Sequence, residues 1–271
     1  MDDLTNQDIV DVLDDAERLV PVARGDVYLP LLEGKVLANM FFENSTRTRM
    51  SFETAMKRLG GSVLNFTSIG TSVAKGETLY DTMQMVDGYA DVAVIRHPRQ
   101  GAAQYSADAV GIPILNAGDG AGNHPTQTML DLFTIRQVHG TLEGLNVALV
   151  GDLRYGRTVH SLSHALVRFG AELTLVSPST LKMPVEIVSD LKEHGAKITE
   201  TDSLEEQIAN ADVIYVTRIQ KERFPDEDEY VKVAGIYKIE ASDLSGAKKG
   251  MIVMHPLPRV DEISPHPPSV V

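Results

Sequence analysis

Short apolar runs alternate with amphipathic segments along almost the whole chain. The runs have the length, and many of the β-branched residues, of buried strands. They fall at residues 36–42, 91–95, 112–117, 146–151, 172–177, 197–201, 212–217 and 251–255. Between them, apolar residues recur at helical spacing, and two clear examples are Phe52, Ala55, Met56 and Leu59 before Gly60, and Val159, Leu162, Leu166 and Phe169 before Gly170. This alternation predicts an α/β protein with mainly parallel sheets.

The alternation also divides the chain into two halves. A helix-like segment of residues 124–139 ends at Gly140, and a new series of strands begins at Asn146. At 271 residues the chain is long enough for two domains of about 130 residues, each with its own core. We therefore expect two doubly wound domains, 1–140 and 141–271, with their boundary between residues 135 and 145.

Polar segments follow six of the strand-like runs. They are residues 44–48, 96–98, 118–125, 152–158, 217–220 and 255–259. Because ligands of open α/β sheets bind beyond the carboxyl ends of the strands, these segments are expected to meet in one crevice. The arginines that most of them carry predict a small, strongly anionic ligand.

Composition limits the classes of function. The formal net charge of −13 argues against a general nucleic-acid surface and requires anion-binding residues to be locally concentrated. The absence of cysteine excludes disulfides, thiolate metal sites and thiol nucleophiles. No apolar run approaches the roughly 20 residues that span a bilayer, and the acidic N-terminus lacks the pattern of a signal peptide. A cytoplasmic protein fits these features.

The segment Ser45-Thr46-Arg47-Thr48 carries the strongest local signal. It lies between a predicted strand and the start of a predicted helix, where free backbone N–H groups and the helix dipole attract anions. Its three hydroxyls and its guanidinium add further donors. Ser and Thr are also the usual residues of an ordinary helix N-cap, so capping is the alternative to a phosphate site.

Seven motifs then occur in order between Leu37 and Ile263. They are FFENSTRTRMSFE, VAKGET, VIRHP, HPTQ, GDLRYGRTVHSL, TRIQKER and HPLPRVDEI. The set resembles the aspartate carbamoyltransferase catalytic chains of the aspartate/ornithine carbamoyltransferase family. The resemblance implies transfer of the carbamoyl group of carbamoyl phosphate to L-aspartate, the committed step of pyrimidine biosynthesis, in a cleft between the two domains. It implies no cofactor, no metal and no covalent intermediate, so catalysis depends on positioning and charge stabilisation.

The resemblance assigns a role to each matching residue. The carbamoyl phosphate residues are Ser45, Thr46, Arg47, Thr48, Arg96, His124, Gln127 and the backbone at Pro256, Leu257 and Pro258. The catalytic residues among these are Arg47, Thr48, Arg96 and His124. The aspartate-binding residues are Lys75, Arg157, Arg218 and Gln220. The residues implied in domain closure are Glu43, Arg157 and Arg223, although a solvated surface charge is the alternative for Arg223.

Three further expectations concern assembly and chemistry. Ser72 and Lys75 resemble residues that a neighbouring subunit lends to the site, which implies a homotrimer with shared sites. Regulatory chains are potential partners, whereas nucleic acid and membrane are not expected. We expect His124 to donate a hydrogen bond to the carbamoyl oxygen and not to act as a general base, with a helix-start residue as the alternative.

Two other functions stay open on the sequence. Ornithine carbamoyltransferases share the carbamoyl phosphate half but carry a cysteine in an HCLP segment, whereas this chain has HPLP at 255–258. Arg157, Arg218 and Lys75 instead favour a dicarboxylate as the acceptor. A non-catalytic scaffold chain is the second alternative, because the chain ends eight residues after VDEI and the family's final C-terminal helix is expected to be absent.

Three motifs carry weaker signals. Gly118, Gly120 and Gly122 lack the spacing of a dinucleotide-binding loop, and GDLRYGRT lacks the Gly-Lys-Ser/Thr ending of a P-loop. His160 and His164 have the i, i+4 spacing of a zinc site, but no third ligand is evident. We expect these two histidines to have packing or surface roles.

Overall fold

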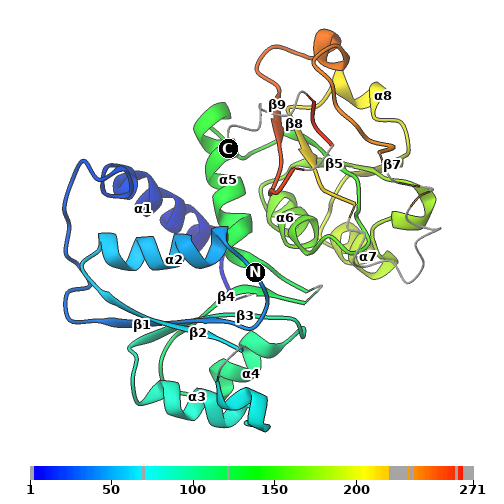
Figure 1. Cartoon of the computed structure of the whole chain (residues 1–271). Coiled ribbons are helices and arrows are strands. Elements are labelled where there is room, and N and C mark those ends of the chain that lie inside the picture. The colour runs from blue at the N-terminus through cyan, green and yellow to red at the C-terminus, as the bar shows by residue number, and fades with distance from the viewer. Residues whose placement is uncertain are drawn as a thin grey trace. The chain divides into compact units, whose positions relative to one another are not determined.

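The computed structural model describes residues 3–68, 71–120, 122–219, 231, 233, 235–259 and 262–264. The chain divides into two compact units, Asp2–Met129 and Leu130–Val271. Each is built on a parallel sheet with helices packed on it (Figure 1), so the predicted α/β class with parallel sheets is confirmed. Among the described helices, none combines the length and the apolar character needed to cross a membrane.

The first unit has a four-stranded parallel sheet in the order β2-β1-β3-β4. Its strands are β1 (Val36–Phe41), β2 (Ser62–Thr67), β3 (Val92–His97) and β4 (Ile114–Asp119). Its helices are α1 (Asn6–Arg24), α2 (Arg47–Arg58), α3 (Leu79–Asp87) and α4 (Ala102–Ala109), with the short 3-10 helix η1 (Ser72–Lys75). In Figure 1, α1 and α2 lie over one face of this sheet and α3 and α4 over the other.

Strand β1 shows why the central strands are apolar throughout. Leu37 belongs to the core on one face, together with Met56 of α2. Met40 points to the opposite face, where it belongs to the core with Met83 of α3. A strand that is buried on both faces has no polar side, so the sequence shows a continuous apolar run and not an alternating one.

The second unit has a five-stranded parallel sheet in the order β7-β6-β5-β8-β9. Its strands are β5 (Asn146–Val150), β6 (Glu172–Val176), β7 (Ile198–Thr201), β8 (Val213–Val216) and β9 (Ile252–Met254). Its helices are α6 (Arg157–Arg168), α7 (Val185–Glu193) and α8 (Glu205–Ile208), with the 3-10 helices η2 (Ser179–Leu181) and η4 (Asp243–Gly246). Helix α5 (Pro125–His139) begins in the first unit and ends in the second.

Helices α2, α5 and α6 form where apolar spacing predicts them. Helix α6 buries Val159, Leu162 and Leu166 and ends before Gly170, and α5 ends before Gly140. Helices α1 and α4 and strand β2 are not among the predicted elements. The carboxyl ends of β3 and β4 also differ from the prediction, and β4 continues to Asp119. Arg96 and His97 are the last residues of β3 and not the start of the following loop, because pairing with β4 continues as far as His97 and Asp119.

Candidate active site

In each unit the strand order reverses at one point of the sheet. The reversal lies between β1 and β3 in the first unit and between β5 and β8 in the second. The connections that leave the two strands turn to opposite faces there, and the crevice between them is where doubly wound proteins bind ligands. Glu43 and residues 44–48 follow β1, and Arg96 lies at the end of β3. Residues 152–158 follow β5, and Arg218 follows β8.

At the first of these points, Ser45-Thr46-Arg47-Thr48 leads into helix α2. Thr46 occupies the N-cap position, but its side chain makes no capping hydrogen bond. In the part of the chain that the structure describes, none of these four side chains forms a hydrogen bond. Ordinary capping therefore does not account for the hydroxyls, which are available to an anion together with the first backbone N–H groups of α2.

Arg96, near the end of β3, contacts residues that lie at or beyond the carboxyl ends of the two neighbouring strands, β1 and β4. Its side chain is only 11% exposed, and its Nη2 donates to Oε1 of Glu43 at 3.2 Å. Its Nη1 donates to the backbone oxygen of Ala117 at 3.2 Å and lies 3.5 Å from Nε2 of His124. Glu43 follows β1, Ala117 lies in β4 and His124 precedes α5, so Arg96 is held in place from both neighbouring strands.

The surroundings of His124 determine which ring nitrogen carries the proton. His124 is buried, and the backbone N–H of Gln127 lies 3.3 Å from its Nδ1. Because an N–H group can only donate, Nδ1 accepts, and the proton of the neutral imidazole is on Nε2. Nε2 of His124 and Nη1 of Arg96 are then two donors 3.5 Å apart, an arrangement that suits a shared oxygen acceptor.

Asp119 shapes the loop before His124. Its carboxylate accepts the N–H groups of Gly101 and Asn123, each at 2.8 Å. Gly120 has a φ of 54°, and a Cβ there would lie 2.8 Å from the oxygen of Pro98. None of the seven motifs marks Asp119, although an aspartate between two glycines after a strand is typical of a turn in which the carboxylate binds backbone N–H groups.

His97, the residue after Arg96, is kept neutral by its surroundings. Burial lowers the pKa of His97, and its ring packs against Phe42 with centroids 5.1 Å apart. Its Nδ1 accepts the backbone N–H of Arg99 at 3.0 Å. The ring therefore supports the end of β3 without adding a second formal charge beside Arg96.

The second point of reversal brings Arg157 and Arg218 to adjacent strand ends. Arg157 begins α6 and is 8% exposed, whereas Arg218 is half-buried. Gly151 follows β5 with a φ of 113°, and a Cβ there would clash with the backbone oxygen of Thr217. The hydroxyl of Thr217 donates to the oxygen of Val150 at 3.1 Å, which holds the two chain segments together. Two guanidinium groups at one strand edge suit a ligand with two carboxylates.

Asp152 is a second residue to which no motif assigns a role. Its side chain is fully buried, and Oδ1 accepts the backbone N–H of Tyr155 at 2.9 Å. This contact shapes the segment that leads to Arg157. The signal for it was present in the Gly-Asp sequence directly after a strand.

The other predicted site residues are distributed as follows. Leu257 and Pro258 follow β9 and are joined by a cis peptide bond, with a φ of 62° at Leu257. Ser72 and Lys75 are the first and last residues of η1, and both are exposed. Gln220 and Arg223 lie outside the described residues.

The two histidines of the potential zinc pair have separate partners. Nε2 of His160 lies 2.8 Å from the backbone oxygen of Leu153, and Nδ1 of His164 lies 3.3 Å from Oδ2 of Asp190. His160 is buried and His164 is partly exposed. These contacts agree with packing and surface roles.

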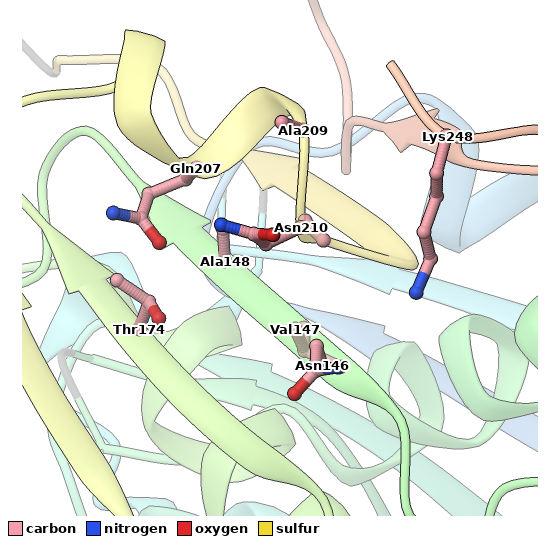
Figure 2. Close-up of a pocket in the computed structure, with 9 residues that line it drawn as sticks. Asn146, Val147, Ala148, Thr174, Gln207, Ala209, Asn210 and Lys248 are labelled. Atoms are coloured by element: carbon pink, nitrogen blue, oxygen red, sulfur yellow. The ribbon is translucent and has the colours of Figure 1, made fainter.

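A polar hollow of about 430 Å³ lies at the amino ends of β5 and β8 in the second unit, opposite the carboxyl ends that lead to Arg157 and Arg218 (Figure 2). It is lined by Asn146, Val147, Ala148, Thr174, Gln207, Ala209, Asn210, Ala211 and Lys248. These residues come from the first halves of β5 and β6, the connection from α8 to β8 and the segment before β9. Asn146 and Asn210 are exposed, so water satisfies their amides, and we do not assign the active site to this hollow.

Guanidinium and hydroxyl donors at the strand ends of two doubly wound sheets define an α/β protein that binds small anions. Comparison with known proteins makes the class specific. The family model of the aspartate/ornithine carbamoyltransferase carbamoyl-P binding domain matches residues 1–137, and that of the Asp/Orn binding domain matches residues 143–266. The chain therefore belongs to the aspartate/ornithine carbamoyltransferase family, as its motifs predict.

Individual relatives agree with this assignment. The aspartate carbamoyltransferase catalytic subunit of Archaeoglobus fulgidus is 57% identical over 264 residues, which cover 97% of this chain and 87% of the relative. The catalytic subunit of M. jannaschii aspartate transcarbamoylase superposes with a TM-score of 0.89 at 52% identity, covering 97% of this chain and 86% of that one. Trypanosoma cruzi aspartate transcarbamoylase in complex with carbamoyl phosphate and aspartate superposes with a TM-score of 0.92 at 43% identity, covering 97% and 85%.

Proposed function

We propose that this chain transfers the carbamoyl group of carbamoyl phosphate to the amine of L-aspartate. The uncharged amine attacks the carbamoyl carbon, a C–N bond forms, and the C–O bond to the phosphate breaks. The amine proton passes to the departing phosphate, so the products are N-carbamoyl-L-aspartate and phosphate. Residues 1–140 bind carbamoyl phosphate and residues 141–271 bind aspartate, in line with the descriptions of the two matching family models.

The pair of donors formed by Arg96 and His124 is the observation that carries this proposal. As the amine attacks, negative charge develops on the carbamoyl oxygen. Two N–H donors that lie 3.5 Å apart can both bind this oxygen, and they stabilise the developing charge more than the uncharged carbonyl, which lowers the barrier. His124 keeps its Nε2 proton throughout, and the hydroxyl of Thr48 supplies a third donor.

The remaining residues of the first unit hold the leaving group and the carbamoyl nitrogen. Ser45, Thr46 and Arg47 bind the phosphate with side-chain donors that form no hydrogen bond within the described residues. The side chain of Gln127 and the backbone carbonyls of residues 256–258 accept from the carbamoyl NH2 group. Glu43 accepts from Arg96 at 3.2 Å, and it joins Arg157 and Arg223 in an ion-pair set that links the domains when they close.

Aspartate is bound through its carboxylates by Arg157, Arg218 and Gln220. Ser72 and Lys75 complete the site of a neighbouring subunit in a homotrimer. Two observations support this part of the proposal: the relatives are named as catalytic subunits, and η1 exposes both side chains. The same names make regulatory chains a potential further partner.

Substitution of Arg218 tests the assignment of substrates. We expect Arg218→Ala to raise the KM for aspartate by roughly 10- to 100-fold, because it removes a charged donor to a carboxylate. The KM for carbamoyl phosphate is expected to stay near the wild-type value. The measurement is steady-state formation of carbamoyl aspartate, with the exposed Arg24→Ala on α1 as the matched control.

Three outcomes would contradict the proposal. An equal rise of both KM values would show that Arg218 does not distinguish the substrates. Carbamoylation of L-ornithine in preference to L-aspartate would favour the ornithine activity. A folded wild-type chain without turnover at saturating substrates would favour a non-catalytic scaffold.

A further inference from the structure

His255, the first residue after β9, clamps the segment that follows it. Its Nδ1 accepts the backbone N–H of Leu257 at 2.8 Å. Its Nε2 lies 3.8 Å from Oε2 of Glu262, and the two side chains are only 4% and 8% exposed. The imidazole therefore lies between the turn at residues 255–257 and a buried carboxylate, which is beyond hydrogen-bond distance of Nε2 but close enough for an electrostatic contact.

The hydrogen bond from Leu257 determines the tautomer of His255. An N–H group can only donate, so Nδ1 is the acceptor and the proton of the neutral imidazole is on Nε2, which faces Glu262. A carboxylate is the side chain that best stabilises this tautomer, because it accepts only.

Glu262 is itself fixed from the other side. Its backbone oxygen accepts the N–H of Ile239 at 2.8 Å, and Ile239 also forms a parallel bridge with Ile263. Ser264 then donates its N–H to the oxygen of Ile239 at 2.8 Å. The carboxylate is thus held by a buried part of the second unit, since Ile239 is 1% exposed.

The turn at residues 255–257 needs such support because the side chain of Leu257 does not anchor it. Leu257 has a φ of 62°, a conformation that residues with a Cβ rarely adopt and that persists only when the surroundings impose it. The side chain of Leu257 is 47% exposed, so apolar burial does not hold the backbone there. The hydrogen bond to His255 is the contact that acts directly on the Leu257 N–H.

We propose that His255 and Glu262 are positioning residues that aim the backbone carbonyls of residues 256–258 at the carbamoyl NH2 group. This inference rests on the proposed function, in which those carbonyls accept from that group. Because the phosphate is bound elsewhere, at residues 45–48, the clamp affects recognition of the carbamoyl half alone. Loss of the clamp is therefore expected to weaken the binding of carbamoyl phosphate and to leave the binding of inorganic phosphate unchanged.

Four variants of the full chain test the clamp. Glu262→Ala removes the carboxylate that faces Nε2 and is expected to lower kcat/KM for carbamoyl phosphate by about 10- to 100-fold, as displaced contacts do in positioned sites. Glu262→Gln retains an acceptor oxygen and is expected to recover most of that loss. His255→Asn preserves the turn, since an asparagine oxygen accepts the N–H two residues later, but loses Glu262. We expect it to fall between the other two, with Glu240→Ala, an exposed neighbour, as the control.

The decisive readout is the ratio of two affinities measured on the same folded variant. We expect the inhibition constant of inorganic phosphate to stay at the wild-type value in Glu262→Ala while the KM for carbamoyl phosphate rises. A parallel loss of both affinities, or wild-type kinetics in Glu262→Ala, would overturn the inference. An inactive wild-type chain would instead overturn the proposed function, so the two failures are distinguishable.

Discussion

Single residues in this chain fall into two groups according to whether the fold uses their side chains. Asp119 and Asp152 are committed to backbone N–H groups and fix loops, whereas the side chains of residues 45–48 have no hydrogen bonds within the described part of the chain. Sequence motifs predicted the second group because ligand-binding residues form recognisable sets. They did not identify the first group, because an aspartate that shapes a turn belongs to no ligand-binding set, although the turn signal itself is local for Asp152 with Tyr155 and for Asp119 with Asn123.

Tyr237 illustrates how burial acts on one ionisable side chain. Burial, and to a lesser extent the charge of Asp202, raises the pKa of Tyr237 to about 12. Its hydroxyl donates to the backbone oxygen of Asp202 at 3.1 Å, and its side chain belongs to the core of the second unit. The phenol of an unfolded chain titrates near pH 10, so the fold favours the neutral form.

We therefore predict a pH-dependent effect of Tyr237→Phe. The raised pKa gives stability that is fully present below pH 10 and is lost as the pH rises from about 10 to about 12. Below pH 10 the wild type is expected to be about 1 kcal/mol more stable, through the hydroxyl hydrogen bond. Near pH 11 this advantage falls by about 1 kcal/mol. Urea unfolding of both proteins between pH 8 and 11 measures the difference, and a constant gap would contradict the prediction.

At the scale of elements, both sheets have the same pair of contacts at the amino ends of their central strands, an aspartate that accepts a backbone N–H and pairs with a lysine. Asp91, directly before β3, accepts the N–H of Val36, the first residue of β1, at 2.8 Å. Asp212, directly before β8, accepts the N–H of Asn146, the first residue of β5, at 2.9 Å. In each case a lysine pairs with the same carboxylate, Lys35 at 2.8 Å in the first unit and Lys248 at 2.5 Å in the second.

These contacts align the amino ends of β1 with β3 and of β5 with β8. The site residues lie at the carboxyl ends of the same strands. Most strands and helix ends could be predicted from the sequence, because apolar runs and glycines mark them locally, whereas β2, which is partly exposed, was not predicted. The strand orders could not be predicted beyond the doubly wound class, since pairing between β1 and β3 or β5 and β8 joins residues more than 50 positions apart. Contacts such as Asp91 with Val36 help to select that pairing, but nothing local in the sequence shows them.

We predict that substitution of Asp212 lowers the stability of the protein at neutral pH and that this effect becomes smaller in acid. Partial burial alone would raise the pKa of Asp212, but Lys248 and the N–H of Asn146 outweigh it and lower the pKa. A lowered pKa gives stability that is present above the unfolded value of about 4 and is lost as the pH falls through the folded value. At pH 7, Asp212→Ala is expected to cost about 1 to 2 kcal/mol and Asp212→Asn less, because the amide oxygen still accepts.

The measurement for Asp212 is urea unfolding of the three proteins from pH 7 down to pH 3. The gap between the wild type and Asp212→Asn should begin to narrow below pH 4 and should keep narrowing as the pH falls towards the lowered folded pKa of Asp212. Glu240→Ala, an exposed change in the same unit, serves as the control. A gap at pH 3 as wide as the gap at pH 7 would show that charge is not what the wild-type side chain contributes.

The whole molecule raises the question of which chain supplies each part of the site. The proposed site draws His124, Arg96 and Arg218 from one chain and Lys75 from the next. The family assignment came from seven motifs spread over the sequence, and it could be made without a structure because each motif is local. The assembly could not be derived in the same way, since an exposed 3-10 helix such as η1 does not show what it contacts.

Complementation between two inactive variants tests the shared site directly. We expect Lys75→Ala and His124→Ala each to have very low activity when expressed alone. In a mixed trimer, a site that takes His124 from one chain and Lys75 from a neighbour of the other kind contains neither substitution. With random mixing this applies to about one quarter of the sites, so coexpression should restore about a quarter of the wild-type activity.

The control for this experiment is a pair of variants whose two residues are contributed to the site by the same chain. His124 and Arg218 are both proposed to act within their own chain, so every site of a trimer that mixes His124→Ala with Arg218→Ala carries one of the two changes. That mixture should stay inactive, whereas the mixture with Lys75→Ala regains activity. If neither mixture recovers while light scattering shows trimers, Lys75 acts within its own chain, and the exposed position of η1 must have another explanation.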